Sequence, residues 1–76
     1  MEFDHDLDAT GLLCPLPVLK ARKRLKALAP GDTLTMLADD PAAIIDVPHF
    51  CAEAGHEFLG QSDGTGHQIY RIRKGG

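Results

Sequence analysis

The chain has 76 residues, of which 43% are hydrophobic and 25% are charged, and its net charge is −3. This length predicts one domain with a modest core, spanning residues 1–76. The acidic balance argues against a nucleic-acid-binding surface, which normally carries an excess of basic residues. The chain also has no Trp, one Tyr and three Phe, which disfavours aromatic platforms for stacked bases.

The chain shows no sign of membrane insertion or export. No stretch approaches the ~20 apolar residues that span a bilayer, and the first six residues, MEFDHD, are acidic. We therefore expect a cytoplasmic protein that does not contact membranes. Its two cysteines, Cys14 and Cys51, are too few for a disulfide framework and should stay reduced there. Each is then either a core residue or a reactive thiol.

The first half of the chain predicts a strand, a helix and a second strand. Alternating apolar and polar residues indicate a short strand at 7–9. The next apolar residues recur at helical spacing on one face: Val18, Ala21, Leu25 and Leu28. Pro30-Gly31 ends this helix. Residues 33–38 predict a strand with one buried face: Leu34, Met36 and Ala38.

The second half predicts another helix and a hairpin. Asp40 is expected to cap this helix and Pro41 to be its first residue. Its apolar stripe is Ile44, Val47, Cys51 and Ala54. Pro48 predicts a kink within the helix, and Gly55 predicts its C-terminal cap. Strands at 57–59 and 68–73 then flank a turn at 63–66.

The predicted order is therefore β-α-β-α-β-β, an α+β fold. A right-handed crossover makes the first two strands parallel, while the last two form an antiparallel pair. Two amphipathic helices and four strands most simply form a two-layer α/β sandwich. In this arrangement, both helices cover one face of a four-stranded mixed sheet.

Cys14-Pro15-Leu16-Pro17 is the most informative segment of the sequence. Prolines are tolerated in the first turn of a helix, and a residue before a proline is kept away from helical angles. The helix should therefore begin near Leu16 or Pro17, with Cys14 at its threshold in a stiffened loop. A small buried junction residue is the alternative interpretation of Cys14.

The start of this helix is expected to favour the thiolate of Cys14. Amide groups and the helix macrodipole place positive charge near the sulfur, the amides being those of Leu16, Val18 and Leu19. Basic side chains on the next turns add to it: Lys20, Arg22 and Lys23. We therefore expect the pKa of Cys14 to lie below its ordinary value. Since no Cys-X-X-Cys spacing is present, a one-thiol group carrier or a mixed-disulfide former is favoured over a dithiol oxidoreductase.

The remaining candidate residues have simpler interpretations. Cys51 is expected in the core, with a resolving role for Cys14 as the alternative. His49, Cys51 and His56 lack the spacing of a ligand pair, so we expect no metal and no cofactor. Five of the eight basic residues lie between Lys20 and Lys26. They form either a solvated helix face or a docking patch for an acidic partner.

The segment from Leu7 to Pro17, LDATGLLCPLP, resembles the signature of the TusA (SirA-like) sulfur-carrier family, whose core is Gly-Leu-X-Cys-Pro-X-Pro. The likeness continues over nearly the whole chain: Pro30-Gly31-Asp32, Ala38-Asp39-Asp40-Pro41-Ala42, Asp46-Val47-Pro48, Phe50-Cys51, His56-Glu57 and Ile72-Arg73-Lys74-Gly75-Gly76. One departure is Leu16, because the family commonly has Glu between the two prolines. Its absence makes the first turn less negative and bears on the choice of acceptor.

The resemblance implies the same sandwich fold and a sulfurtransferase of the carrier kind. Cys14 would accept a sulfane sulfur as a persulfide, with Pro15 and Pro17 as the supporting motif. The implied donor is a cysteine desulfurase, and the acceptor is the next protein of a relay that leads to 2-thiouridine in tRNA. The candidate docking positions are Arg22, Lys23 and Asp40. Alternatives are a carrier in sulfur oxidation or cofactor biosynthesis, and a non-enzymatic regulatory interaction module.

Overall fold

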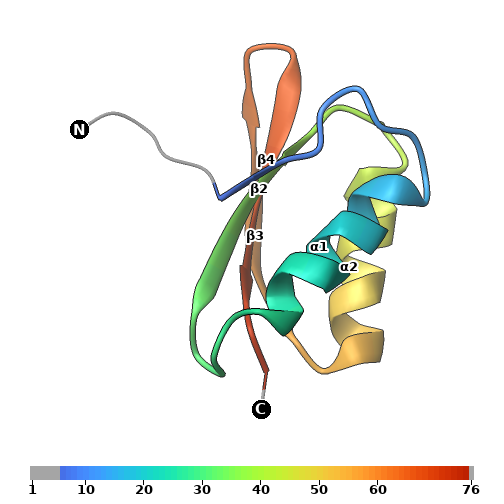
Figure 1. The fold of residues 1–76 in the computed structure, drawn as a ribbon. Coiled ribbons are helices and arrows are strands. Elements are labelled where there is room, and N and C mark those ends of the chain that lie inside the picture. The colour runs from blue at the N-terminus through green and yellow to red at the C-terminus, as the bar shows by residue number, and fades with distance from the viewer. Residues whose placement is uncertain (1–5, 76) are drawn as a thin grey trace.

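A computed structural model describes residues 6–75 of the chain. The elements are β1 (Leu7–Asp8), α1 (Leu16–Lys26), β2 (Thr33–Ala38), α2 (Ala43–Ala54), β3 (Glu57–Gly64) and β4 (His67–Arg73). The strands form one sheet in the order β1-β2-β4-β3, with β1 parallel to β2 and the other pairs antiparallel. Both helices lie on the same side of the sheet (Figure 1). The predicted α+β two-layer sandwich is confirmed.

The core lies between the sheet and the helices and is mainly aliphatic. β2 contributes the face that the sequence predicts, because Leu34, Met36 and Ala38 are fully buried. The predicted stripe of α1 also faces the core, since Ala21 and Leu25 are buried. Val18 and Leu28 are partly buried against the same cluster. The orientation of α1 is therefore fixed by the apolar spacing of its sequence.

The buried face of α2 differs from the predicted one. Val47 and Cys51 are buried as expected, but Ile44 is 48% exposed and Ala54 is also exposed. Phe50 takes part in the core instead, together with Ala43. Because apolar residues lie on more than one side of this helix, their spacing does not define a single stripe. The assigned helix runs through Pro48 from Ala43 to Ala54.

α2 also begins later than expected. Pro41 lies in a turn that precedes the helix, and Ala42 occupies the N-cap position. Asp40 still satisfies a backbone amide, because its Oδ1 accepts the Ala42 N–H at 3.1 Å. Asp40 therefore stabilises the turn and is not the cap of the helix itself. At the other end, Gly55 has a left-handed φ of 80° and forms the predicted C-cap.

The hairpin is longer than the sequence suggests. β3 extends to Gly64, which pairs with His67, so the turn contains only Thr65 and Gly66. The sequence predicts a strand only at 57–59 and a turn at 63–66, yet residues 60–64 pair with β4 at one edge of the sheet.

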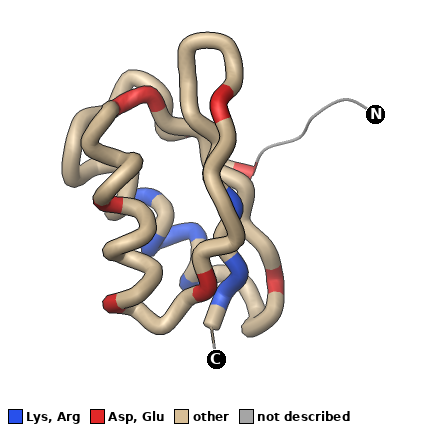
Figure 2. Tube along the Cα trace, turned by 180° about the vertical axis from the view of Figure 1, so that it is seen from behind, with Lys and Arg blue, Asp and Glu red and all other residues tan. Residues whose placement is uncertain are grey.

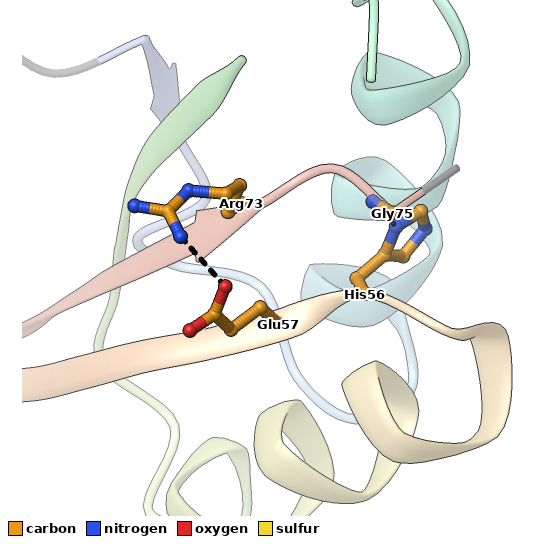
Figure 3. Close-up of polar contacts among 4 residues, drawn as sticks. All are labelled: His56, Glu57, Arg73 and Gly75. Atoms are coloured by element: carbon orange, nitrogen blue, oxygen red, sulfur yellow. Dashed lines mark hydrogen bonds and ion pairs between the residues drawn. The ribbon is translucent and has the colours of Figure 1, made fainter. Parts of the chain in front are cut away.

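Two contacts hold the far end of this hairpin. Arg73 and Glu57 form an ion pair across the strands, with 2.7 Å between Nη1 and Oε1. The Gly75 N–H donates to Nδ1 of His56 at 3.0 Å, beside the end of α2 (Figure 3). The ion pair joins β3 to β4, and the hydrogen bond holds the chain after β4 beside the C-terminal end of α2.

Candidate functional site

The candidate site lies where two loops meet. The loop from β1 to α1 carries Cys14, and the loop from β2 to α2 runs beside it (Figure 1). The Gly11 N–H donates to Oδ1 of Asp39 at 2.9 Å, and the Cys14 N–H donates to Oδ2 of Asp40 at 2.6 Å. The carboxylates of one loop therefore hold the backbone of the other. Asp40, expected only to cap a helix and face a partner, thus also positions the cysteine.

Cys14 lies at the threshold of α1, as the two prolines predict. The helix begins at Leu16, Pro15 occupies the N-cap position and Pro17 is buried within the first turn. The peptide bond between Cys14 and Pro15 is cis. The thiol of Cys14 is free and the residue is exposed. The proline motif thus presents the thiol at the surface in front of the helix.

The backbone amides around Cys14 are largely engaged by the protein itself. The Leu16 N–H donates to the Leu13 carbonyl at 2.8 Å, and the Leu19 N–H donates to the Pro15 carbonyl at 3.1 Å. The Cys14 N–H is bound by Asp40. Two of the three amides expected to stabilise a thiolate therefore already have backbone acceptors.

Cys14 opens into a pocket of about 240 Å³ between the two helices. α1 contributes Val18 and Arg22, and α2 contributes the remaining walls beside Pro15: Asp46, His49, Phe50 and Glu53. The Arg22 guanidinium lies over the Phe50 ring, 5.7 Å from its centroid. Two carboxylates and one guanidinium thus share a small space with the thiol.

The pKa of Cys14 is raised, contrary to the expectation from the sequence. The main cause is a hydrogen bond to the side chain of Asp46, followed by desolvation and by the negative charges of Asp46 and Asp40. A carboxylate that accepts from the thiol stabilises the protonated form. No local feature of the sequence indicates a role for Asp46, although the Asp46-Val47-Pro48 segment is part of the family resemblance. Only the packing of α2 against α1 brings it to Cys14.

The basic residues of α1 point to two different sides. Arg22 lines the pocket of Cys14, whereas Lys20 and Lys23 line a separate groove of about 300 Å³ with apolar walls: Leu7, Leu16 and Leu19. In Figure 2 the acidic positions follow α2 and the loop before it, while basic positions gather on α1. The basic run of the sequence is therefore not one patch around the thiol.

A second hollow continues the pocket of Cys14 along the helices. It has a volume of about 340 Å³ and shares Arg22, Phe50 and Glu53 with the first. Its far end is basic, through Lys26 and Lys74. The groove between the helices thus changes from acidic near the thiol to basic near the end of β4.

Cys51 lies in the core, as expected, with 1% of its surface exposed. Burial raises the pKa of its thiol to about 11. Within residues 6–75, no group of three or more His, Cys, Asp or Glu side chains is placed to hold a metal ion. His49 was one of the candidate metal ligands in the sequence. Its Nε2 lies 3.6 Å from Oε2 of Glu53 on the surface of α2.

Exposed apolar side chains surround the two loops. Leu13, next to Cys14, is 69% exposed, and Ile45, at the start of α2, is 74% exposed. Leu16 between the two prolines is 46% exposed. An exposed thiol framed by apolar side chains and charges is a surface suited to contact with another protein.

Comparison with known proteins identifies the family. The sequence model described as sulfurtransferase TusA matches residues 5–74. The chain belongs to the TusA sulfurtransferase family. The crystal structure of a SirA-like protein from Desulfitobacterium hafniense is similar, with 29% identity and a TM-score of 0.62 over 92% of this chain and 96% of that one. In the described part of this TusA-family chain, no helix is long and apolar enough to cross a membrane.

Proposed function

We propose that Cys14 carries a sulfane sulfur as a persulfide between two proteins. The observation that carries this proposal is the exposed thiol at the head of the inter-helical pocket, since the other thiol is buried. Family membership adds the class of chemistry, sulfur transfer. Pro15 and Pro17 support the site by fixing the loop and the first turn of α1.

The donor in this proposal is the persulfide of a cysteine desulfurase, and the acceptor is a cysteine of a downstream relay protein. Cys14 attacks the outer sulfur of the donor persulfide, and the donor cysteine leaves as its thiolate. In the second step the acceptor thiolate attacks the outer sulfur on Cys14 and the S–S bond of the persulfide breaks. Cys14 leaves as a thiolate and takes up the proton that the acceptor thiol gave up. No electrons enter or leave the pair of proteins, so neither step needs a cofactor.

The surroundings of Cys14 are suited to protein partners. The apolar side chains beside the thiol provide area that a partner can bury, and Arg22 and Asp40 offer charges of both signs at its edge. Lys23 belongs to the neighbouring groove, where it can contact the same partner. We place this relay in the cytoplasm, with 2-thiouridine formation in tRNA as its end point and without direct contact to nucleic acid.

The test is incubation with a cysteine desulfurase and cysteine, followed by mass spectrometry of the peptides. A gain of one sulfur on the Cys14 peptide, passed on when a relay acceptor is added, supports the proposal. Cys51→Ala serves as the control that keeps Cys14, and it should load equally well. Absence of added sulfur on Cys14 would instead favour a regulatory interaction module.

A further inference from the structure

Asp46 and Cys14 meet although they lie on different elements. Asp46 is in the first turn of α2, and Cys14 precedes α1. Both line the pocket between the helices, and the Asp46 carboxylate is the main cause of the raised pKa of the thiol. The backbone of Cys14 is held in place by Asp40. The geometry therefore fixes the sulfur beside a negative charge.

We propose that Asp46 is a positioning residue that stabilises the empty, protonated carrier relative to the loaded, charged one, and so drives release of the sulfane sulfur. This inference rests on the proposed persulfide function of Cys14. It concerns the direction of transfer, which that function leaves open. Asp46 takes no sulfur itself and forms no covalent bond.

The balance of the transfer explains why a carboxylate matters. At neutral pH a persulfide is more acidic than a thiol, so loading converts the neutral Cys14 thiol into a persulfide anion. The proton of Cys14 ends on the donor cysteine, which becomes a neutral thiol. The inner sulfur then has no proton to donate to Asp46. The neutral thiol beside Asp46 is replaced by a second negative charge, which lies further from the carboxylate only by the S–S bond length of about 2 Å.

Unloading reverses each of these changes. The acceptor thiol gives its proton to Cys14 and takes the outer sulfur as its own persulfide anion. Cys14 is again a neutral thiol beside Asp46. The interaction with Asp46 is thus favourable in the empty state and unfavourable in the loaded state, which is the requirement for shifting an equilibrium.

Other charged and titratable groups face the same thiol, and their roles differ. The groups around the pocket are Arg22 from α1, Asp40 from the loop before α2, and Asp46, His49 and Glu53 from α2. Asp40 is engaged by the N–H groups of Cys14 and Ala42. Glu53 lies near His49. Asp46 is the carboxylate that contributes most to the raised pKa of the thiol.

The experiment measures the partition of sulfane sulfur between Cys14 and glutathione at neutral pH. The wild-type protein and Asp46→Asn are loaded with a desulfurase and cysteine, separated from it and equilibrated with glutathione. The loaded fraction is then read by alkylation and mass spectrometry. Because the amide leaves no negative charge beside the persulfide, we expect Asp46→Asn to shift the partition toward the loaded carrier. Its pH profile for alkylation of Cys14 should move to lower pH.

The controls separate this effect from changes of structure. Glu53→Gln removes a carboxylate from the same pocket and should shift the partition less than Asp46→Asn. Asp46→Glu restores the charge and should move the partition back toward the wild-type value. Equal partition in wild type and Asp46→Asn overturns the inference, even when both proteins load normally. Failure of the wild-type protein to load at Cys14 overturns the proposed function itself.

Discussion

Cys14 and Cys51 are the same side chain in two opposite environments. Cys14 is exposed in the loop between β1 and α1, whereas Cys51 is 1% exposed on the buried face of α2. The pKa of both thiols is raised, by hydrogen bonding to Asp46 in one and by burial in the other. A raised pKa alone therefore does not mark a thiol as inert. The physical cause of the raised pKa decides whether a bound partner can lower it again.

The exposed thiol has a protonation state that a bound protein can change. Its hydrogen-bond acceptor is a half-buried carboxylate that borders an open pocket, where Arg22 also lies. A cation brought by a partner would weaken the field of Asp46 at the sulfur. The buried thiol offers no such access, because its raised pKa comes from the core around it. A partner that placed a cation at this pocket would therefore lower the pKa of Cys14 toward its ordinary value.

The largest expected effect is the loss of Cys14 itself. In Cys14→Ser the hydroxyl cannot carry a sulfane sulfur, so loading from cysteine through a desulfurase should fall to background. The fold should be nearly unchanged, because residue 14 is exposed and its backbone N–H still reaches Asp40. Radiolabelled sulfur transfer and thermal melts measure the two quantities. Loading retained in this variant would contradict the assignment of the site.

The second prediction concerns access to the two thiols. In the folded protein iodoacetamide should modify Cys14 and leave Cys51 unmodified, because burial blocks attack at the latter. The Cys14 reaction should have a higher pH midpoint in the folded protein than in the unfolded chain, since Asp46 raises its pKa. Unfolding in denaturant should give both thiols midpoints near the ordinary value of about 8.5. Peptide mass spectrometry resolves the two sites, and a Cys14 midpoint that does not fall on unfolding would exclude the carboxylate effect.

The position of Cys14 could be predicted from its sequence neighbours, but its electrostatics could not. Pro15 and Pro17 restrict the chain locally, so the threshold of α1 follows from backbone sterics alone. The expectation of a low pKa for Cys14 rests on the helix start and on the basic residues of the same segment. Asp46 comes from another element and enters through tertiary packing. The charge that dominates the site is therefore the one that local sequence does not show.

The same distinction explains the errors in the fold. The buried face of α1 is predicted correctly because the opposite face is strongly basic, so only one side of the helix can be buried. α2 has Ile44, Ile45 and Phe50 on different sides, so burial is decided by contact with the sheet. The polar residues of β3 pair with β4 at an edge, where composition carries little information about pairing.

The third prediction addresses the buried thiol. Cys51→Ala should keep full loading of Cys14 and lower the free energy of unfolding by about 1 kcal/mol, as expected for a small truncation in a core. Loss of loading with an unchanged melt would show that Cys51 takes part in the chemistry. Loading and melting curves on the same preparation distinguish these results.

The buried thiol should also make stability depend on pH. The pKa of Cys51 is raised from 9.0 to about 11 in the folded state, so the unfolded chain loses this proton first. Below the pKa of Cys51 in the unfolded chain, the protonated thiol makes its full contribution to the free energy of unfolding. This contribution is lost as the pH rises toward 11. The slope approaches about 1.4 kcal/mol per pH unit. Burial also raises the pKa of Tyr70, to about 12. Subtracting the Cys51→Ala curve isolates the Cys51 contribution from that of Tyr70, and identical slopes in both proteins would contradict it.

The smallest expected effect separates the two sides of α1. Arg22 lines the pocket of Cys14, whereas Lys23 lines the groove with Leu16 and Leu19. Arg22→Glu should slow sulfur acceptance several-fold at low salt, because it adds a third carboxylate beside Asp46 and Glu53 and weakens steering toward the donor. Lys23→Glu should have a smaller effect, and added salt should reduce both. Single-turnover loading rates at two ionic strengths measure this. A larger effect of Lys23→Glu would mean that the donor docks mainly on the outer groove of α1.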